Sequence, residues 1–511
     1  MKKRITEFLS NNFLTIITGV AITISLGVFI IYYSQDLTLI YGDARIRLNI
    51  ARRVIDSLTP GLTQLGSVWP PLPHLLFLTT IWNDYMYYSG LSGSIVSMAS
   101  YVITIVFLSK LLFETTKDKK ATVIGTLFIL LNPSLLFMQT TPMTESLFIG
   151  LLTLSAFLLW RWYKSQDVLY LIGTAMVIFC ASLIRYDGWF LAVTIAAVVG
   201  FLAFLKGGYR MMEGNFLLYA TPAFLGMAGW ILYQLIILGS PFAFAIGEGS
   251  GSFYLKSAEA SGLAHTKYHL LNSFLTYSWT IIDNVGLIAV AVIFFGLIYL
   301  LLLGRKLSIF IPVIILSSPI AFNIVSLFIG QSVLFTEHLP PFGLYNIRYG
   351  LLSLPFIAFL AGWLAAKKTI FKISLLVIIL LQTGILLQSK PITLREPLRF
   401  SEHPTGIGQK ELSGWLREHP IQGLTLLSAL ANDSLVFDAH IKNSKLIYEG
   451  SGKFWKESLE SPSSMAERAI ISPNNPRDAV WKASQENDKF FDGFNLVFEN
   501  EHYRVFDKKG I

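Results

Sequence analysis

Long apolar stretches recur through most of this sequence and restrict its fold more than any other feature. About eleven of them lie within residues 1–390, each close to the ~20 residues that an α-helix needs to cross a bilayer. The composition agrees, since 53% of the residues are hydrophobic and only 14% are charged. The sequence therefore predicts a polytopic α-helical membrane protein. The expected spans are 13–33, 90–112, 121–138, 144–163, 168–184, 188–205, 215–238, 283–303, 308–330, 349–366 and 370–388.

The basic residues predict an orientation for these spans. The stretch Met1-Lys2-Lys3-Arg4 precedes the first span, which is longer than the core of a signal peptide, so we expect an uncleaved helix with a cytoplasmic N-terminus. Of the 25 Lys and Arg residues in 1–390, 16 fall on the predicted cytoplasmic side. The remaining nine lie on the outer side, against the insertion bias, and cations in such positions indicate a bound anion such as a lipid-linked phosphate. These nine are Arg45, Arg47, Arg52, Arg53, Arg185, Lys256, Lys267, Arg348 and Lys390.

The composition changes at about residue 391. Residues 391–511 hold 15 basic and 17 acidic residues, whereas 1–390 hold 25 and 15, so the net positive charge belongs to the membrane part and gives no reason to expect a nucleic-acid partner. Short apolar runs alternate with helical patterns in this segment, which predicts an extracytoplasmic α/β domain over 391–511. Its expected strands are 424–428, 445–448, 469–471, 495–498 and 503–506, with helices near 409–418 and 477–485.

The first outer loop, 34–72, carries an amphipathic pattern. Ile46, Ile50 and Val54 recur at i, i+4 and i+8, which predicts a helix over 44–57 that lies in the membrane interface. Arg45, Asn49, Arg52 and Asp56 share another face of this helix.

Asp43 stands just before this predicted helix and has two interpretations. Aspartate is a favoured N-cap residue, so Asp43 is expected to cap the helix. A carboxylate at the membrane surface can also act as a general base toward an acceptor hydroxyl. The two roles are compatible with each other.

Further charged residues stand at the outer ends of later spans. Glu145 opens the fourth span, where a carboxylate favours the positive end of a helix or takes part in a functional site. Arg185 and Asp187 lie in a tight hairpin and either pair with each other or serve a site. Arg348 opens the tenth span, and its planar, permanently charged guanidinium is suited to a phosphate.

The sequence gives little support for a metal site. His74, His265, His269 and His338 all lie on the predicted outer side, but no pair has a strong ligand spacing, so a divalent metal is the minority alternative. Asn432-Asp433-Ser434 in the outer domain is a formal glycosylation sequon.

Five short motifs lie on the predicted outer side. They are Tyr41-Gly42-Asp43, Thr144-Glu145-Ser146-Leu147-Phe148, Arg185-Tyr186-Asp187-Gly188, Gly239-Ser240-Pro241-Phe242 and Asn346-Ile347-Arg348-Tyr349. These motifs resemble those of the C-type integral-membrane glycosyltransferases (the GT-C superfamily), which use sugars linked to polyprenyl or dolichyl phosphate. Two departures are Ser146, where the family has proline, and Ala44, where protein O-mannosyltransferases and aminoarabinose transferases have a second acid.

The resemblance implies an inverting transferase that moves a sugar, most readily a mannose-like hexose, to an acceptor hydroxyl on a protein, lipid or glycan at the outer face. It assigns Asp43 as the catalytic base and implies no cofactor. Arg348, Arg185, Arg45 and Arg52 are expected to bind the donor phosphate. The expected substrate-orienting residues are Glu145, Asp187, Tyr349, His74 and Lys256.

Two other functions fit the same features less well. A transporter or flippase of lipid-linked saccharide should show an internal repeat and charges near the bilayer midplane, and the sequence shows neither. An enzyme of the oligosaccharyltransferase type would use a diphosphate donor and a divalent metal.

Overall fold

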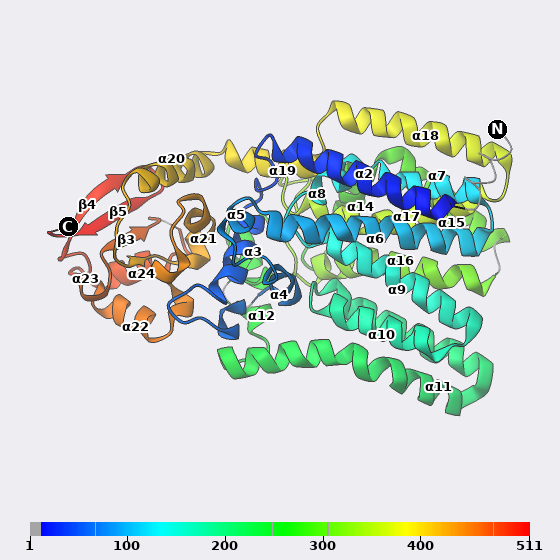
Figure 1. Cartoon of the computed structure of the whole chain (residues 1–511), viewed down its shortest axis with the longest axis horizontal. Helices are drawn as coiled ribbons and strands as arrows, with labels where there is room; N and C mark the ends of the chain where they lie inside the picture. The colour runs from blue at the N-terminus through cyan, green and yellow to red at the C-terminus, as the bar shows by residue number, and fades with distance from the viewer. Residues whose placement is uncertain (1–11, 67, 248, 304–305, 474, 511) are drawn as a thin grey trace.

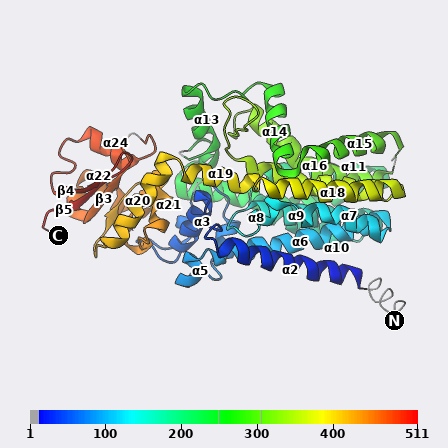
Figure 2. The same ribbon diagram turned by 90° about the horizontal axis from the view of Figure 1, so that it is seen from above.

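The computed structural model describes residues 12–66, 68–247, 249–303, 306–473 and 475–510. The molecule is elongated, with a bundle of long helices at one end, a small sheet with its helices at the other, and short helices between them (Figure 1). The view from above shows the same order along the long axis (Figure 2). We call the end of the bundle that meets these short helices the cluster end. The segment Met1-Lys2-Lys3-Arg4 lies outside the described residues, so the cytoplasmic N-terminus stays a prediction.

Eleven helices make up the bundle as described. Within the part of the chain that the structure describes, seven helical segments are long and apolar enough to cross a membrane, or eight if the sharply bent pair α14 and α15 forms one span. α11 is interrupted by non-helical Gly207 and Gly208, and its two arms correspond to the two expected spans 188–205 and 215–238. The structure thus supports a polytopic membrane protein, and the number of eleven spans stays a prediction. The helices are α2 (Phe13–Tyr33), α6 (Leu91–Thr116), α7 (Lys119–Leu130), α9 (Glu145–Ser165), α10 (Val168–Ser182), α11 (Asp187–Leu238), α14 (Leu270–Val285), α15 (Leu287–Leu303), α16 (Leu307–Phe328), α17 (Leu354–Ala365) and α18 (Thr369–Gln388).

Short helices gather at the cluster end. α3 carries the charged stretch of the first loop, and α19 joins the last bundle helix to the C-terminal part (Figure 1). Because these elements converge there, residues far apart in the chain meet at this end. The elements are α3 (Gly42–Arg53), η1 (Leu62–Leu65), α4 (Leu72–Phe77), α5 (Asp84–Tyr88), α8 (Pro133–Met138), α12 (Ala243–Ile246), α13 (Gly251–Ala260), η2 (Ile347–Ser353) and α19 (Ile392–Ser401).

The C-terminal part is built on a five-stranded sheet of order β2-β1-β3-β5-β4. β1 (Thr425–Leu426) pairs in parallel with β2 (Leu446–Ile447) and β3 (Arg468–Ile471), and β5 (Arg504–Lys508) lies antiparallel to β3 and β4 (Phe494–Glu499). Its central strand is buried on both faces, as expected when helices cover both sides of a sheet. These helices are α20 (Pro404–Glu418), α21 (Ala429–Asp438), α22 (Lys453–Glu460), α23 (Pro462–Met465) and α24 (Ala479–Glu486), with short turns η3 (Asn443–Lys445) and η4 (Glu449–Ser451).

The helix of the first loop does not lie free in the membrane interface as expected. α3 spans Gly42–Arg53 rather than 44–57, and it packs against α4 and η1 on one side and against α21 of the C-terminal part on another. Arg53 donates to both carboxylate oxygens of Asp433, at 3.0 and 2.5 Å, and Asn49 donates to the Asp433 carbonyl and carboxylate at 2.7 Å. The hydrophobic pattern therefore misled the prediction, because a polar face of the helix is buried against charged partners.

The sequon at Asn432 is not an accessible acceptor. Asn432 is buried, its side-chain amide donates to Asp478 at 3.2 Å, and its carbonyl oxygen accepts from the Ser472 hydroxyl at 2.6 Å. A residue bonded in this way is a structural part of the domain core.

Candidate active site

A network of carboxylates and arginines forms where α3, α9, α11, η2 and α19 meet. Arg348 is its centre, buried and paired with three carboxylates. Its Nη2 lies 2.6 Å from Asp43 Oδ2, its Nε lies 3.1 Å from Glu145 Oε1, and its Nη1 lies 3.3 Å from Glu396 Oε1. We call this set of ion pairs the arginine cluster. Three carboxylates around one buried guanidinium leave local negative charge that other cations must offset.

Arg185 supplies one of these cations. Its Nη1 lies 3.1 Å from Glu145 Oε1 and its Nε lies 3.0 Å from Asp187 Oδ2. Burial disfavours the charged form of Arg185, but Asp187 and Glu145 outweigh this effect and raise its pKa. Asn323 of α16 donates to Asp187 at 3.1 Å and completes the network. The pairing of Arg185 with Asp187 considered in the sequence is present, and it extends into the arginine cluster.

Asp43 is the most accessible acid of the arginine cluster. It is the second residue of α3, and the N-cap position belongs to Tyr41, so the interpretation of Asp43 as a side-chain cap is wrong. Its side chain is 34% exposed, whereas those of Glu145 and Glu396 are 1% and 8% exposed. Among the described residues, its second oxygen, Oδ1, accepts no hydrogen bond. Asp43 thus presents a free carboxylate oxygen beside a buried cation.

Aromatic rings line the buried side of the arginine cluster. The Arg348 guanidinium lies 5.2 Å from the centre of the Tyr41 ring and 5.4 Å from that of Tyr349, and Arg185 lies 4.7 Å from Tyr349. The Tyr41 hydroxyl donates to the Thr393 carbonyl at 2.6 Å. Burial raises the pKa of Tyr41 well above its usual value, so this hydroxyl stays protonated. The rings fix the arginines by cation–π contacts and exclude water from them.

Arg47 is the buried cation without a direct carboxylate partner. It is 6% exposed, and its Nε and Nη1 have no hydrogen-bond partner among the described residues. Its guanidinium stacks on Trp69 at 4.0 Å. Burial lowers the pKa of Arg47 to about 10, and the nearby charges of Asp43 and Glu145 only partly oppose this effect. A buried guanidinium with unmet donors is poised to take an anion.

His74 and Glu145 also carry unmet polar atoms near Arg47. His74 is fully buried, both ring nitrogens have no partner within the described residues, and Glu145 Oε2 has none either. Burial and, to a smaller extent, the charge of Arg47 lower the pKa of His74 well below its usual value. Unmet groups on three neighbouring residues mark a polar site, because buried polar groups are normally bonded to protein or to ordered water.

His74 predicts a pH dependence of stability. Because its folded-state pKa lies below the value near 6.5 of an unfolded chain, the unfolded state binds more protons below that pH, and stability falls as the pH drops through it. The His74 contribution should approach about 1.4 kcal/mol per pH unit. Thermal melting of the detergent-purified protein between pH 7.5 and 5.5 measures this slope. His74→Gln should reduce the slope, and an unchanged slope would contradict the assignment.

Three residues assigned from the sequence lie outside the arginine cluster. Arg45 pairs with Asp438 of the C-terminal part, and Arg52 pairs with Asp56 at 3.1 Å and Asp84 at 2.7 Å. Lys256 is exposed on α13. Among the described residues, no group of three or more His, Cys, Asp or Glu side chains is placed to hold a metal ion.

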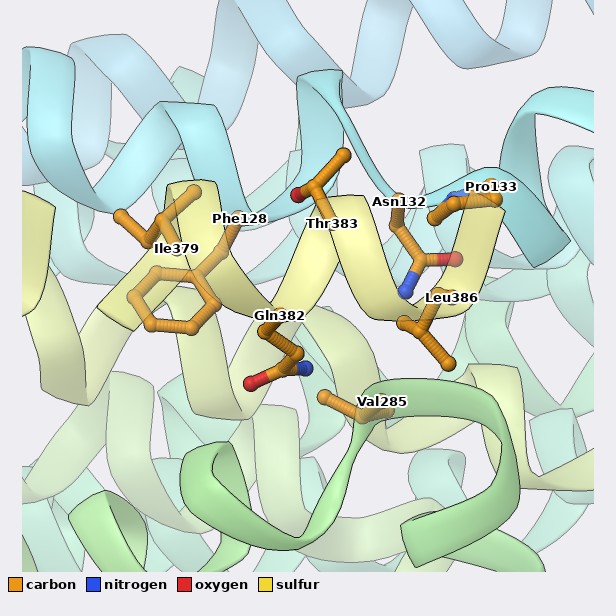
Figure 3. A pocket seen from close by; sticks show the side chains of 8 residues that line it. All are labelled: Phe128, Asn132, Pro133, Val285, Ile379, Gln382, Thr383 and Leu386. Carbon is orange, nitrogen blue, oxygen red and sulfur yellow. The ribbon is translucent and has the colours of Figure 1, made fainter. Parts of the chain in front are cut away.

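A small pocket inside the bundle is separate from the arginine cluster and shares no residue with it. Asn132 there donates to the Asn284 carbonyl at 2.9 Å, and the side-chain carbonyl oxygen of Gln382 is buried without a partner in the described chain. Figure 3 shows its lining residues, which come from α7, the turn into α8, α14 and α18.

The sequence missed two residues of the site. Glu396 was placed in the soluble domain, although its position just beyond the last span was a signal for the site. Arg47 was one of the nine outer cations but received no role, because the helical pattern did not show which arginine faces the bundle.

The fold and the arginine cluster together define a polytopic membrane protein with a charged site at one end of its bundle. No protein-family model matches the chain, and no curated protein does.

Solved structures share the fold. ArnT from Cupriavidus metallidurans in the apo state is similar, with a TM-score of 0.57 and 13% identity over 97% of this chain and 98% of that chain. The same protein bound to undecaprenyl phosphate gives a TM-score of 0.55 at 13% identity over the same shares. The apo oligosaccharyltransferase of Archaeoglobus fulgidus gives 0.51 at 12% identity over 94% of this chain and 71% of that chain. The chain therefore has the fold of the C-type glycosyltransferases, which confirms the resemblance at the level of fold.

Proposed function

We propose that this protein is an inverting glycosyltransferase that moves one sugar from a polyprenyl- or dolichyl-phosphate donor to an acceptor hydroxyl. We expect the transferred sugar to be a mannose-like hexose and the acceptor to be a protein, lipid or glycan. The observation that carries the proposal is the partly exposed Asp43 carboxylate beside the buried, unmet guanidinium of Arg47. ArnT, which shares the fold, binds undecaprenyl phosphate in one of its structures, and this supports a lipid phosphate as the donor. We place the cluster end on the outer face of the membrane.

Asp43 acts as the general base in this proposal. Its Oδ1 takes the proton of the acceptor hydroxyl, and the acceptor oxygen attacks the anomeric carbon opposite the phosphate. The bond between the anomeric carbon and the phosphate oxygen breaks, and its electron pair leaves with the lipid phosphate. One displacement inverts the configuration. The ion pair with Arg348 fixes the direction of the Asp43 carboxylate.

Arg47 is the phosphate ligand that the contacts favour. Arg348 and Arg185 already bind the carboxylates of the cluster, whereas Nε and Nη1 of Arg47 are unmet. A phosphate there would gain charge-assisted hydrogen bonds that strengthen as negative charge grows on the leaving group. His74 and Glu145 lie close enough to orient the donor, and Arg348 adds its charge. Phosphate is a competent leaving group once its charge is met, so we expect no metal requirement.

Arg47→Gln should weaken donor binding. Loss of one charge-assisted hydrogen bond, worth about 1.5–3 kcal/mol, raises the donor KM or Kd by roughly 10- to 150-fold. The matched control is Arg45→Gln on the same helix, which pairs with Asp438 away from the arginine cluster and should change donor binding by less than about threefold. Equal effects of the two variants in a donor titration would contradict the role of Arg47.

The function itself is tested by mass spectrometry of the lipid that co-purifies with the protein, followed by transfer assays with that donor. Release of lipid phosphate together with a glycosylated product, unaffected by chelator, is expected. Movement of the lipid-linked sugar across a vesicle membrane without product would instead identify a transporter. Loss of activity with chelator would favour an enzyme of the oligosaccharyltransferase type, which uses a diphosphate donor and a divalent metal.

A further inference from the structure

A polar pocket lies at the junction between the last bundle helix and the C-terminal part. Its empty volume, including space open to solvent, is about 510 Å³. We call it the junction pocket, and it is separate from the arginine cluster. Its main lining residues are Glu337, Leu344, Lys390, Arg395, Arg399 and Glu402.

α19 separates this pocket from the arginine cluster. Arg395, Arg399 and Glu402 follow one another at i, i+4 and i+7 and line the pocket from one face of the helix. Glu396 is buried on another face and pairs with Arg348. The helix thus connects a surface site to Arg348 of the arginine cluster over a single helical turn.

The junction pocket carries an excess of positive charge. Three cations, Lys390, Arg395 and Arg399, face two acids. Glu337 is shared between Arg395 at 2.8 Å and Arg399 at 3.1 Å, and Lys390 has no ion pair among the described residues. The two arginine side chains are 40% and 57% exposed, so these pairs are weak and leave donors free for another anion.

The junction pocket lies at the end of α18. α18 ends at Gln388, two residues before Lys390, and its last turns expose Ile385 and Leu387. The mostly exposed apolar surface of α18 therefore leads directly to the cations. A ligand with a phosphate and apolar chains matches this combination, since the cations can bind the phosphate and the exposed side chains of α18 can contact the acyl chains.

We infer that the junction pocket binds the phosphate headgroup of an anionic membrane phospholipid, with the acyl chains along α18. The inference depends on the membrane placement of α18 and not on the proposed transfer reaction. A headgroup held by Arg395 and Arg399 would also fix α19, and with it the Glu396 that pairs with Arg348.

The test compares lipid retention in variants of the full chain. The protein is reconstituted in nanodiscs of phosphatidylcholine mixed with phosphatidylglycerol, and native mass spectrometry counts the retained phosphatidylglycerol. Lys390→Glu/Arg399→Glu should lower this retention by at least about tenfold. The matched control, Lys410→Glu/Lys456→Glu, reverses two exposed charges of the C-terminal part and should retain the lipid. The single variant Lys390→Gln changes an exposed side chain and replaces the double variant if the latter does not fold. It should give a smaller decrease in retained lipid.

Three results would overturn the inference. The first is equal retention in the two double variants. The second is displacement of the lipid by millimolar inorganic phosphate, which would identify a site for soluble anions. The third is retention of a polyprenyl phosphate rather than phosphatidylglycerol at these residues, which would identify a donor-loading site. Transfer activity is measured in a separate assay, so a negative result for lipid retention does not contradict the proposed function.

Discussion

Asp43→Asn is expected to lower the transfer rate by about 10²- to 10⁴-fold, the usual range for loss of a general base. Asparagine keeps the size of the side chain, and its carbonyl oxygen can still accept from Arg348 Nη2, so the arginine cluster should stay assembled. The amide cannot take the proton of the acceptor hydroxyl. The measurement is the rate of product formation at saturating donor and acceptor, with the melting temperature as the control for folding.

Comparison of kcat with the donor Kd distinguishes a catalytic role of Asp43 from a binding role. If Asp43 is the base, kcat falls while the donor Kd changes by less than about threefold. A rate within a few fold of wild type would contradict the assignment of Asp43. A raised donor Kd with an unchanged kcat would make it a binding residue.

Arg348→Gln is expected to have the largest effect on stability. The variant leaves Asp43, Glu145 and Glu396 without their common cation, two of them buried, and removal of one partner from a buried ion pair costs about 3–5 kcal/mol. Thermal melting in detergent measures the loss. Arg399→Gln is the matched control, because this arginine is exposed and its pair with Glu337 should contribute less than about 1 kcal/mol.

A second substitution tests the cause of that loss. Adding Glu396→Gln to Arg348→Gln removes one of the uncompensated charges, so the double variant should melt at a higher temperature than Arg348→Gln alone. Equal melting of the single and double variants would show that Arg348 stabilises the protein through packing rather than charge.

Much of the architecture could be predicted from the sequence because its signals are local. Apolar runs of bilayer length mark the helices, and all five expected strands overlap observed ones. The convergence of Asp43, Glu145, Arg185 and Arg348 also followed from local signals. Each lies at a predicted outer end of a span, and helix ends on the same face of a compact bundle lie close together.

The detailed contacts of the site could not be predicted, because they depend on tertiary partners. Arg45, Arg47 and Arg52 lie on one helix and differ only in what packs against them. Arg45 pairs with Asp438 and Arg52 pairs with Asp84. Of the three arginines, Arg47 is the one that lies near the carboxylates of the arginine cluster. Glu396 lies 48 residues from Arg348, and although its position just beyond the last span was a signal for the site, no spacing in the sequence pairs it with that arginine.

The burial of α3 between two parts of the molecule has a thermodynamic consequence. One short helix pairs Asp43 with Arg348 of η2 and Arg53 with Asp433 of α21, so the two ion pairs share a single structural element. By linkage, a donor that orders Asp43 must also stabilise the contact with α21, and an acceptor that holds the C-terminal part must tighten donor binding by the same factor. Slower hydrogen exchange in 429–438 when donor lipid is added would reveal this reciprocity, and unchanged exchange would exclude it.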